Sequence, residues 1–121
     1  MNKIKLSLLA LACLASVSLA TVYQLSIGYG KQLTATTAPQ QITITQNGDE
    51  AYAQSLSVIN YGDSTVFCAV NCTRPVFTNM VNSGIAIPIR KNIRHNFAGA
   101  NFQSLWIQTT NGTADIDVAA H

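Results

Sequence analysis

The sequence predicts an all-β fold, a single antiparallel β-sandwich of about seven to nine short strands. Three observations support this prediction. Apolar and polar residues alternate in short runs, turn residues recur about every 8–12 residues, and no window has sustained helical periodicity. The pattern fits an immunoglobulin-like or a jelly-roll-like sandwich.

The first twenty residues are predicted to be a cleaved secretory signal peptide. Lys3 and Lys5 precede an apolar run over residues 6–17, and small residues stand just before residue 21. The run is shorter than the roughly 20 residues that a membrane-spanning helix needs. A retained anchor and a lipoprotein attached through Cys13 are the alternatives. We therefore expect an exported single domain over residues 21–121, with no membrane attachment after cleavage.

The predicted mature chain has no net charge. The full sequence has seven Lys and Arg, five Asp and Glu and a formal net charge of +2, but two of the lysines lie in the predicted signal peptide. A neutral surface of hydroxyl and amide side chains is poorly protected against self-association. This composition favours a protein that assembles with copies of itself, and it argues against a nucleic-acid partner.

The N-terminal half is predicted to form short strands separated by turns. Tyr23, Leu25 and Ile27 alternate with polar neighbours, which predicts a first strand. Gly28 and Gly30 break this run and predict a flexible hinge. Because such a strand can pair with an open sheet edge of a neighbour, Tyr23, Leu25 and Ile27 are candidate residues of an exchanged strand. Further strands are expected over residues 42–45, 52–58 and 66–70.

The segment of residues 71–82 is the least regular part of the chain, and Pro75 excludes a central strand there. After it, isoleucines alternate over residues 85–89 around Pro88, which has no backbone N–H donor. This strand is therefore expected at a sheet edge or at a bulge. Another short strand is expected over residues 93–97.

The C-terminal segment has the strongest hairpin signal. Residues 105–118 read LWIQTTNGTADIDV, and Asn-Gly is a strongly favoured two-residue hairpin turn. With Asn-Gly at the turn, Ile107 faces Ile116 on the apolar side of the hairpin, and Trp106 faces Asp117 on the polar side. We therefore expect two directly paired strands, with Trp106 turned away from the core.

Two cysteines lie outside the predicted signal peptide, Cys68 and Cys72. In a continuous strand their Cα atoms would be about 13 Å apart, beyond the roughly 4.4–6.8 Å of a disulfide. A disulfide therefore needs a turn between them, and export to an oxidising compartment favours it. The alternatives are unbonded thiols, one buried and one exposed, or pairing between molecules.

No constellation of residues indicates catalysis, a cofactor or a metal. A Cys68/His95 pair has no third orienting group, and two histidines are poor material for acid–base catalysis. A zinc site built from the cysteines with His95 or His121 has an uncommon spacing. We therefore expect no enzymatic activity, no cofactor and no metal site.

Two surface features are candidates for binding. Arg90, Lys91 and Arg94 belong to the densest group of charges, which favours an anionic polysaccharide, with a solvated loop as the alternative. Trp106 on a polar face is usually covered by another part of the domain, by a partner subunit or by a stacked sugar.

From residue 62 onward the order of segments is informative. It runs GDSTVFCAV, an irregular linker, GIAIPI, HNFAG and LWIQTTNGTADIDV. Over about half of the chain this order resembles small phage-encoded β-sandwich proteins that are virion components. The resemblance implies a structural or attachment subunit with no catalytic residues to carry over. The signal peptide and the Cys68/Cys72 pair depart from that pattern. They leave two variants of this interpretation: a protein of a virus that assembles at the envelope, or a bacterial surface protein with the same fold.

These expectations fit a non-enzymatic, exported structural subunit of a virion, filament or other extracellular assembly. The alternative is a monomeric secreted or periplasmic module that binds a carbohydrate or cell-surface polymer through Trp106 and the loop of residues 90–95. The two functions differ in the oligomeric state and in the exposure of Trp106.

Overall fold

The computed structural model describes residues 21–121, so the predicted signal peptide lies outside the described residues. These residues form ten strands and one helix. The strands are β1 (Thr21–Ser26), β2 (Gly30–Ala35), β3 (Gln40–Gln46), β4 (Asp49–Glu50), β5 (Leu56–Asn60), β6 (Val66–Val70), β7 (Ile87–Ile89), β8 (Arg94–Asn96), β9 (Ser104–Thr109) and β10 (Ala114–Ala120). The helix is α2 (Arg74–Asn82).

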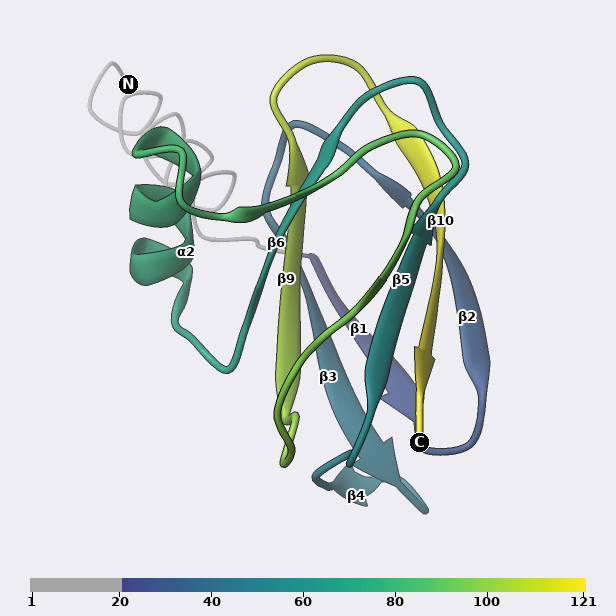
Figure 1. The fold of residues 1–121 in the computed structure, drawn as a ribbon. Coiled ribbons are helices and arrows are strands. Elements are labelled where there is room, and N and C mark those ends of the chain that lie inside the picture. The colour runs from purple at the N-terminus through teal and green to yellow at the C-terminus, as the bar shows by residue number, and fades with distance from the viewer. Residues whose placement is uncertain (1–20) are drawn as a thin grey trace, which may run out of the picture.

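The strands form two sheets that pack face to face (Figure 1). The larger sheet has the order β1-β3-β9-β6-β7, with β4 paired to β3, and the smaller sheet has the order β2-β10-β5-β8. In the described part of the chain β1 and β3 run parallel, and the other strand pairs are antiparallel. The prediction of an all-β sandwich is confirmed, although the strands number ten instead of seven to nine because short pieces such as β4 are included.

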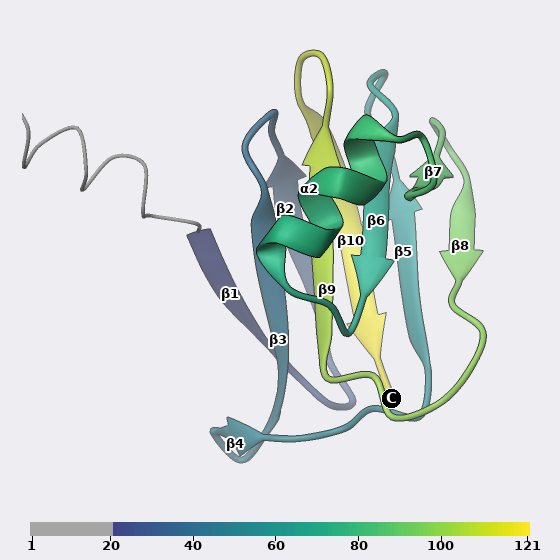
Figure 2. The same ribbon diagram turned by 90° about the vertical axis from the view of Figure 1, so that its left-hand side faces the viewer.

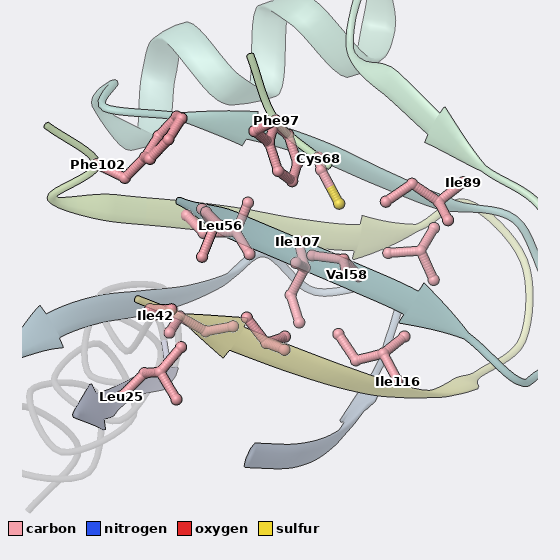
Figure 3. Packing of buried hydrophobic residues seen from close by; sticks show 14 of the residues in the cluster. Leu25, Ile42, Leu56, Val58, Cys68, Ile89, Phe97, Phe102, Ile107 and Ile116 are labelled. Atoms are coloured by element: carbon pink, nitrogen blue, oxygen red, sulfur yellow. The ribbon is translucent and has the colours of Figure 1, made fainter. Parts of the chain in front are cut away.

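The hydrophobic core lies between the two sheets (Figure 3). Alternate side chains of the strands point inward, as the period of two predicts. Each fully buried leucine or isoleucine contributes about 1.5–3 kcal/mol relative to an exposed position. The core includes Leu25, Ile42, Ile44, Leu56, Val58, Val66, Cys68, Ile89, Leu105, Ile107, Ile116 and Val118.

The predicted C-terminal hairpin is wrong. β9 pairs with β3 and β6, whereas β10 pairs with β2 and β5, so the two strands lie in opposite sheets. A type I′ turn needs positive φ at both central residues. Here Gly112 has a φ of 72° but Asn111 does not lie in the left-handed region. Ile107 and Ile116 are both buried as expected, but they face the core from opposite sheets instead of pairing side by side.

The irregular segment forms helix α2, which the sequence pattern did not predict. Pro75 lies in the first turn of the helix, where its missing N–H removes no intrahelical bond. With nine residues, α2 is too short for a helical period to stand out in the sequence. The helix packs on the outer face of the larger sheet, over β6 and β9 (Figure 2).

Two other predictions about the strands are confirmed. β7 contains Pro88 and lies at the edge of the larger sheet, paired with β6 alone. β8 falls within the expected range of residues 93–97 and forms an edge of the smaller sheet.

Candidate interaction site

Trp106 is buried and is therefore not a ligand surface. It is 4% exposed, and its ring stacks on Phe77 of α2 with the ring centroids 5.8 Å apart. Its Nε1 donates a hydrogen bond to the carbonyl oxygen of Cys72 at 2.8 Å. The indole does face away from the core between the sheets, as predicted, but α2 of the same domain covers it. Asp117, its expected neighbour, lies in the other sheet.

The two cysteines are free, and the predicted disulfide is not formed. Cys68 points from β6 into the core between the sheets. Cys72 packs beside Phe77 and Trp106 under α2, on the opposite face of the larger sheet. Since the thiols lie on opposite faces, no turn between them brings the sulfurs together. Burial raises the pKa of both thiols.

The three basic candidates lie in the loop between β7 and β8 and at the start of β8. Lys91 forms an ion pair with Asp63, with 2.6 Å between Nζ and Oδ1, and this hydrogen bond and charge lower the pKa of Asp63. Arg90 is exposed next to β7, and Arg94 lies in β8 opposite Ile59 of β5. An anionic polysaccharide on Arg90, Lys91 and Arg94 stays a prediction.

β1 and β2 form one side of the sandwich, and each is the edge strand of its sheet (Figures 1 and 2). Each strand has six residues and pairs with one neighbour only, β1 with β3 and β2 with β10. Neither contains proline, and Lys31 is the one charged residue in the two strands. Unpaired backbone groups along such an edge are a template for pairing with another chain.

The opposite side of the sandwich is protected against such pairing. β7 and β8 have three residues each. Pro88 interrupts the donors of β7, and Arg94 places a charge on β8. Short strands, proline and charge are devices that prevent pairing between sheet edges. The side formed by β1 and β2 is therefore the more open of the two.

β1 and the residue that follows it contact the core through three side chains. Leu25 is the one fully buried side chain of the strand, at 2% exposed. Tyr23 and Ile27 are half-buried and pack against the core, whereas Val22 is 56% exposed. The candidate exchanged strand is thus an edge strand that pairs in register with β3 of its own chain.

A glycine turn joins β1 to β2 and passes from one sheet to the other. Gly28 has a φ of 89°, in the left-handed region that favours glycine. A Cβ atom at Gly28 would have no heavy atom within 4 Å, but the N–H of Gly28 bonds the carbonyl oxygen of Ala120 in β10 at 2.8 Å. The predicted hinge is therefore a tight turn whose backbone is tied to β10, and an exchange of β1 would have to break that bond.

Two side chains outside the predicted set make polar contacts on this side. Lys31 Nζ donates to the carbonyl oxygen of Gln24 at 3.2 Å, across from β2 to β1. Gln40 of β3 is buried, and its side chain bonds the carbonyl oxygen of Thr34 and the N–H of Thr36. The sequence alone does not indicate Lys31 and Gln40, because their partners depend on which strands lie side by side.

Within residues 21–121 the structure contains no group of three or more side chains that could hold a metal ion.

No helix in the described range is long and apolar enough to cross a membrane.

Comparison with known proteins gives distant likenesses of fold. No family model matches the sequence, and no curated protein matches it. The crystal structure of PirA has a TM-score of 0.49 at 9% identity and covers 77% of this chain and 94% of that chain. The pre-peptidase C-terminal domain of a Bacillus anthracis collagenase has a TM-score of 0.46 at 15% identity, covering 85% and 97%. Aeromonas hydrophila PliG, a periplasmic inhibitor of g-type lysozyme, has a TM-score of 0.45 at 11% identity, covering 85% and 100%.

None of these likenesses indicates a function, because both the TM-scores and the identities are low. The function of this chain is therefore inferred from its own residues.

Proposed function

We propose that the protein is a non-enzymatic, exported structural subunit whose copies assemble by exchanging β1. The assembly is a virion, a filament or another extracellular array. The observation that supports this proposal is the position of β1, an edge strand with one fully buried side chain that is followed by a tight glycine turn. Leaving its own sheet costs this segment the burial of Leu25 and the partial burial of Tyr23 and Ile27, and pairing with a neighbour restores the same contacts.

In the exchange, β1 of one molecule takes the place of β1 on the β3 strand of the next molecule. Leu25 of the neighbour then fills the same position in the core, so the packing that β1 leaves within its own chain is restored between chains. Exchange of an identical element is a low-cost route to oligomers for this reason. If each chain gives its strand to one neighbour and accepts a strand from another, the series has no fixed end.

The balance of charges supports the same function. The five acidic residues of the chain balance the five basic residues outside the predicted signal peptide, so copies do not repel one another through net charge. The alternative, a monomeric module that binds through Trp106, loses its main support because α2 covers that ring.

A pair of cysteines between β1 and β3 tests the exchange. Gln24 lies directly opposite Thr43 in the register, and both side chains point away from the core. Neighbouring strands are about 4.8 Å apart, within disulfide range. We would combine Gln24→Cys and Thr43→Cys with Cys72→Ser, oxidise the assembled protein and run a denaturing gel without reductant.

Exchange predicts a ladder of covalently linked chains that collapses to the monomer on reduction. The control with Gln24→Cys and Cys72→Ser alone should give no band above a dimer. A single monomer band from material that still assembles would show that β1 stays in its own chain, and it would overturn the proposal.

A further inference from the structure

The two sheets differ in what covers their outer faces. Helix α2 packs on the larger sheet, and its apolar side chains cover Trp106 and Ala69. No helix lies over the smaller sheet within the described residues, as Figure 1 shows. The outer face of the smaller sheet is therefore open to solvent, and its side chains are free to meet a ligand.

The register of the smaller sheet places polar and aromatic side chains in two neighbouring rows on this face. In the first row Thr34 of β2 lies opposite Asp115 of β10, and the N–H of Tyr61 bonds the carbonyl oxygen of Asp115 at 2.9 Å. In the second row the order across four strands is Gln32, Asp117, Ile59 and Arg94.

Two hollows lie against these rows and meet at Asp117. The larger, of about 650 Å³, is lined by Tyr61, Asp115 and Thr34 among others, and the smaller, of about 250 Å³, by Ile59 and Arg94 among others. Gln32 and Asp117 line both hollows. Gly30, Ser57 and Ala119 line the smaller hollow and leave room above the strands because their side chains are small.

From this face we infer a binding site for a neutral oligosaccharide, which the assembled subunit would present to a glycan surface. Sugars offer apolar C–H faces and a rim of hydroxyl groups. Tyr61, which is 50% exposed, and the half-buried Ile59 supply apolar surface for the ring faces. The carboxylates accept hydrogen bonds from hydroxyls, and the Gln32 amide both donates and accepts them.

Both carboxylates have oxygen atoms that are available to accept hydrogen bonds from a ligand. Thr34 Oγ1 donates to Asp115 Oδ1 at 2.8 Å, which orients that carboxylate and leaves its other oxygen available. The Asp117 carboxylate has no hydrogen-bond or ion-pair partner within residues 21–121. A half-buried carboxylate without a partner gains from accepting hydroxyl protons.

The charges on this face select the class of sugar. Asp115 and Asp117 line the hollows together with the cations Arg94 and Lys31, so the charges of the lining cancel and neither a polyanion nor a polycation is favoured. Neutral hexoses and N-acetylhexosamines carry hydroxyl and amide groups without charge. A second copy of the chain fits this face less well, because the rows lack the large buried anchors that stabilise protein interfaces.

Calorimetric titration of the mature protein with cellohexaose, maltohexaose and chitohexaose tests the inference. We expect at least one of these neutral hexasaccharides to bind with a dissociation constant of about 1 mM or tighter. Tyr61→Ala and Asp117→Asn should each weaken binding about tenfold. The matched control is Tyr52→Ala, because Tyr52 is also an exposed tyrosine, at 58%, and lines neither hollow.

Three results would overturn the site. They are no heat of binding from any of the three sugars at about 10 mM, equal losses in Tyr52→Ala and Tyr61→Ala, or tighter binding of a polyuronate than of the neutral sugars. Melting curves of the variants separate lost binding from lost folding. Chain exchange is measured on a gel and not by calorimetry, so this proposal and the exchange of β1 fail independently.

Discussion

At the scale of single residues, Asn60 joins the core to two turns. Its side chain is fully buried, and its Nδ2 donates to the carbonyl oxygens of Ser64 and Ile89 at 2.8 Å each. Its Oδ1 accepts a hydrogen bond from the N–H of Gly62 at 2.8 Å. The amide thus supplies hydrogen-bond partners to backbone groups in the turn after β5 and at the end of β7. A buried polar side chain with every partner in place specifies one arrangement of these segments.

Replacing Asn60 by alanine should lower the free energy of unfolding by about 2–4 kcal/mol. The variant leaves two carbonyl oxygens and one N–H without their protein partner, and each unsatisfied buried group costs about 1–3 kcal/mol unless water reaches it. Urea unfolding of the two proteins measures the difference. The matched control is Asn96→Ala, since Asn96 is exposed in β8, and its effect should stay within about 0.5 kcal/mol. Equal effects in the two variants would contradict this role of Asn60.

At the scale of elements, the backbone of β1 alternates between its partner and the open edge. The N–H of Ile27 bonds the carbonyl oxygen of Thr45 in β3, so the residues of the same parity, including Leu25, turn their backbone groups toward β3. The carbonyl oxygen of Gln24 instead accepts a bond from Lys31, on the other side of the strand. Proline at position 24 therefore removes a donor from the open edge alone, whereas proline at position 25 removes one from the ladder.

This alternation separates strand exchange from simple addition at the edge. Exchange predicts that Gln24→Pro still assembles, because the N–H it removes faces away from β3. Leu25→Pro should prevent assembly, because the exchanged strand loses a ladder bond in the neighbour as well as in its own chain. Analytical ultracentrifugation of both variants measures the outcome. A monomeric Gln24→Pro variant, at concentrations where the unmodified protein assembles, would contradict exchange. It would show that the molecules associate by pairing at the open edge of β1.

The elements also show how far local sequence patterns predict structure. Alternation in residues 105–118 identified Ile107 and Ile116 as core positions, because the period of two depends only on the local chain. It did not identify the partner strands, since an Asn-Gly turn serves a corner between sheets as well as a hairpin. Helix α2 has no clear sequence signal because nine residues hold too few turns for a period. Without that helix Trp106 would be exposed. Because the helix was not predicted, the sequence indicated a ligand or subunit interface at Trp106.

The sequence predicts the residues of the core better than those that meet on the open face and the open edge. Asp115 and Asp117 are two residues apart in β10 and share its outer face, as the period of two requires. Their neighbours Gln32 and Tyr61 come from β2 and from the turn after β5, which lie far apart in the chain and meet β10 only in the folded sheet. Residues 23–27 were recognisable as a strand, but the open edge they form depends on β1 lying at the border of its sheet.

At the scale of the whole molecule, the sandwich has one protected side, one open side, one covered face and one open face. The protected side is formed by β7 and β8, and the open side by β1 and β2. The covered face lies under α2, and the open face carries the rows that contain Asp115 and Asp117. A subunit with this arrangement can join its neighbours through one surface and present another to its surroundings.

The native mass of the mature protein tests the central claim most directly. Light scattering on a sizing column, over a hundredfold range of concentration, reports the mass without any variant. The proposed exchange of β1 predicts masses well above one chain of residues 21–121, in a series that extends as the concentration rises. A mass of one chain at every concentration would contradict assembly and leave the oligosaccharide face as the function to pursue.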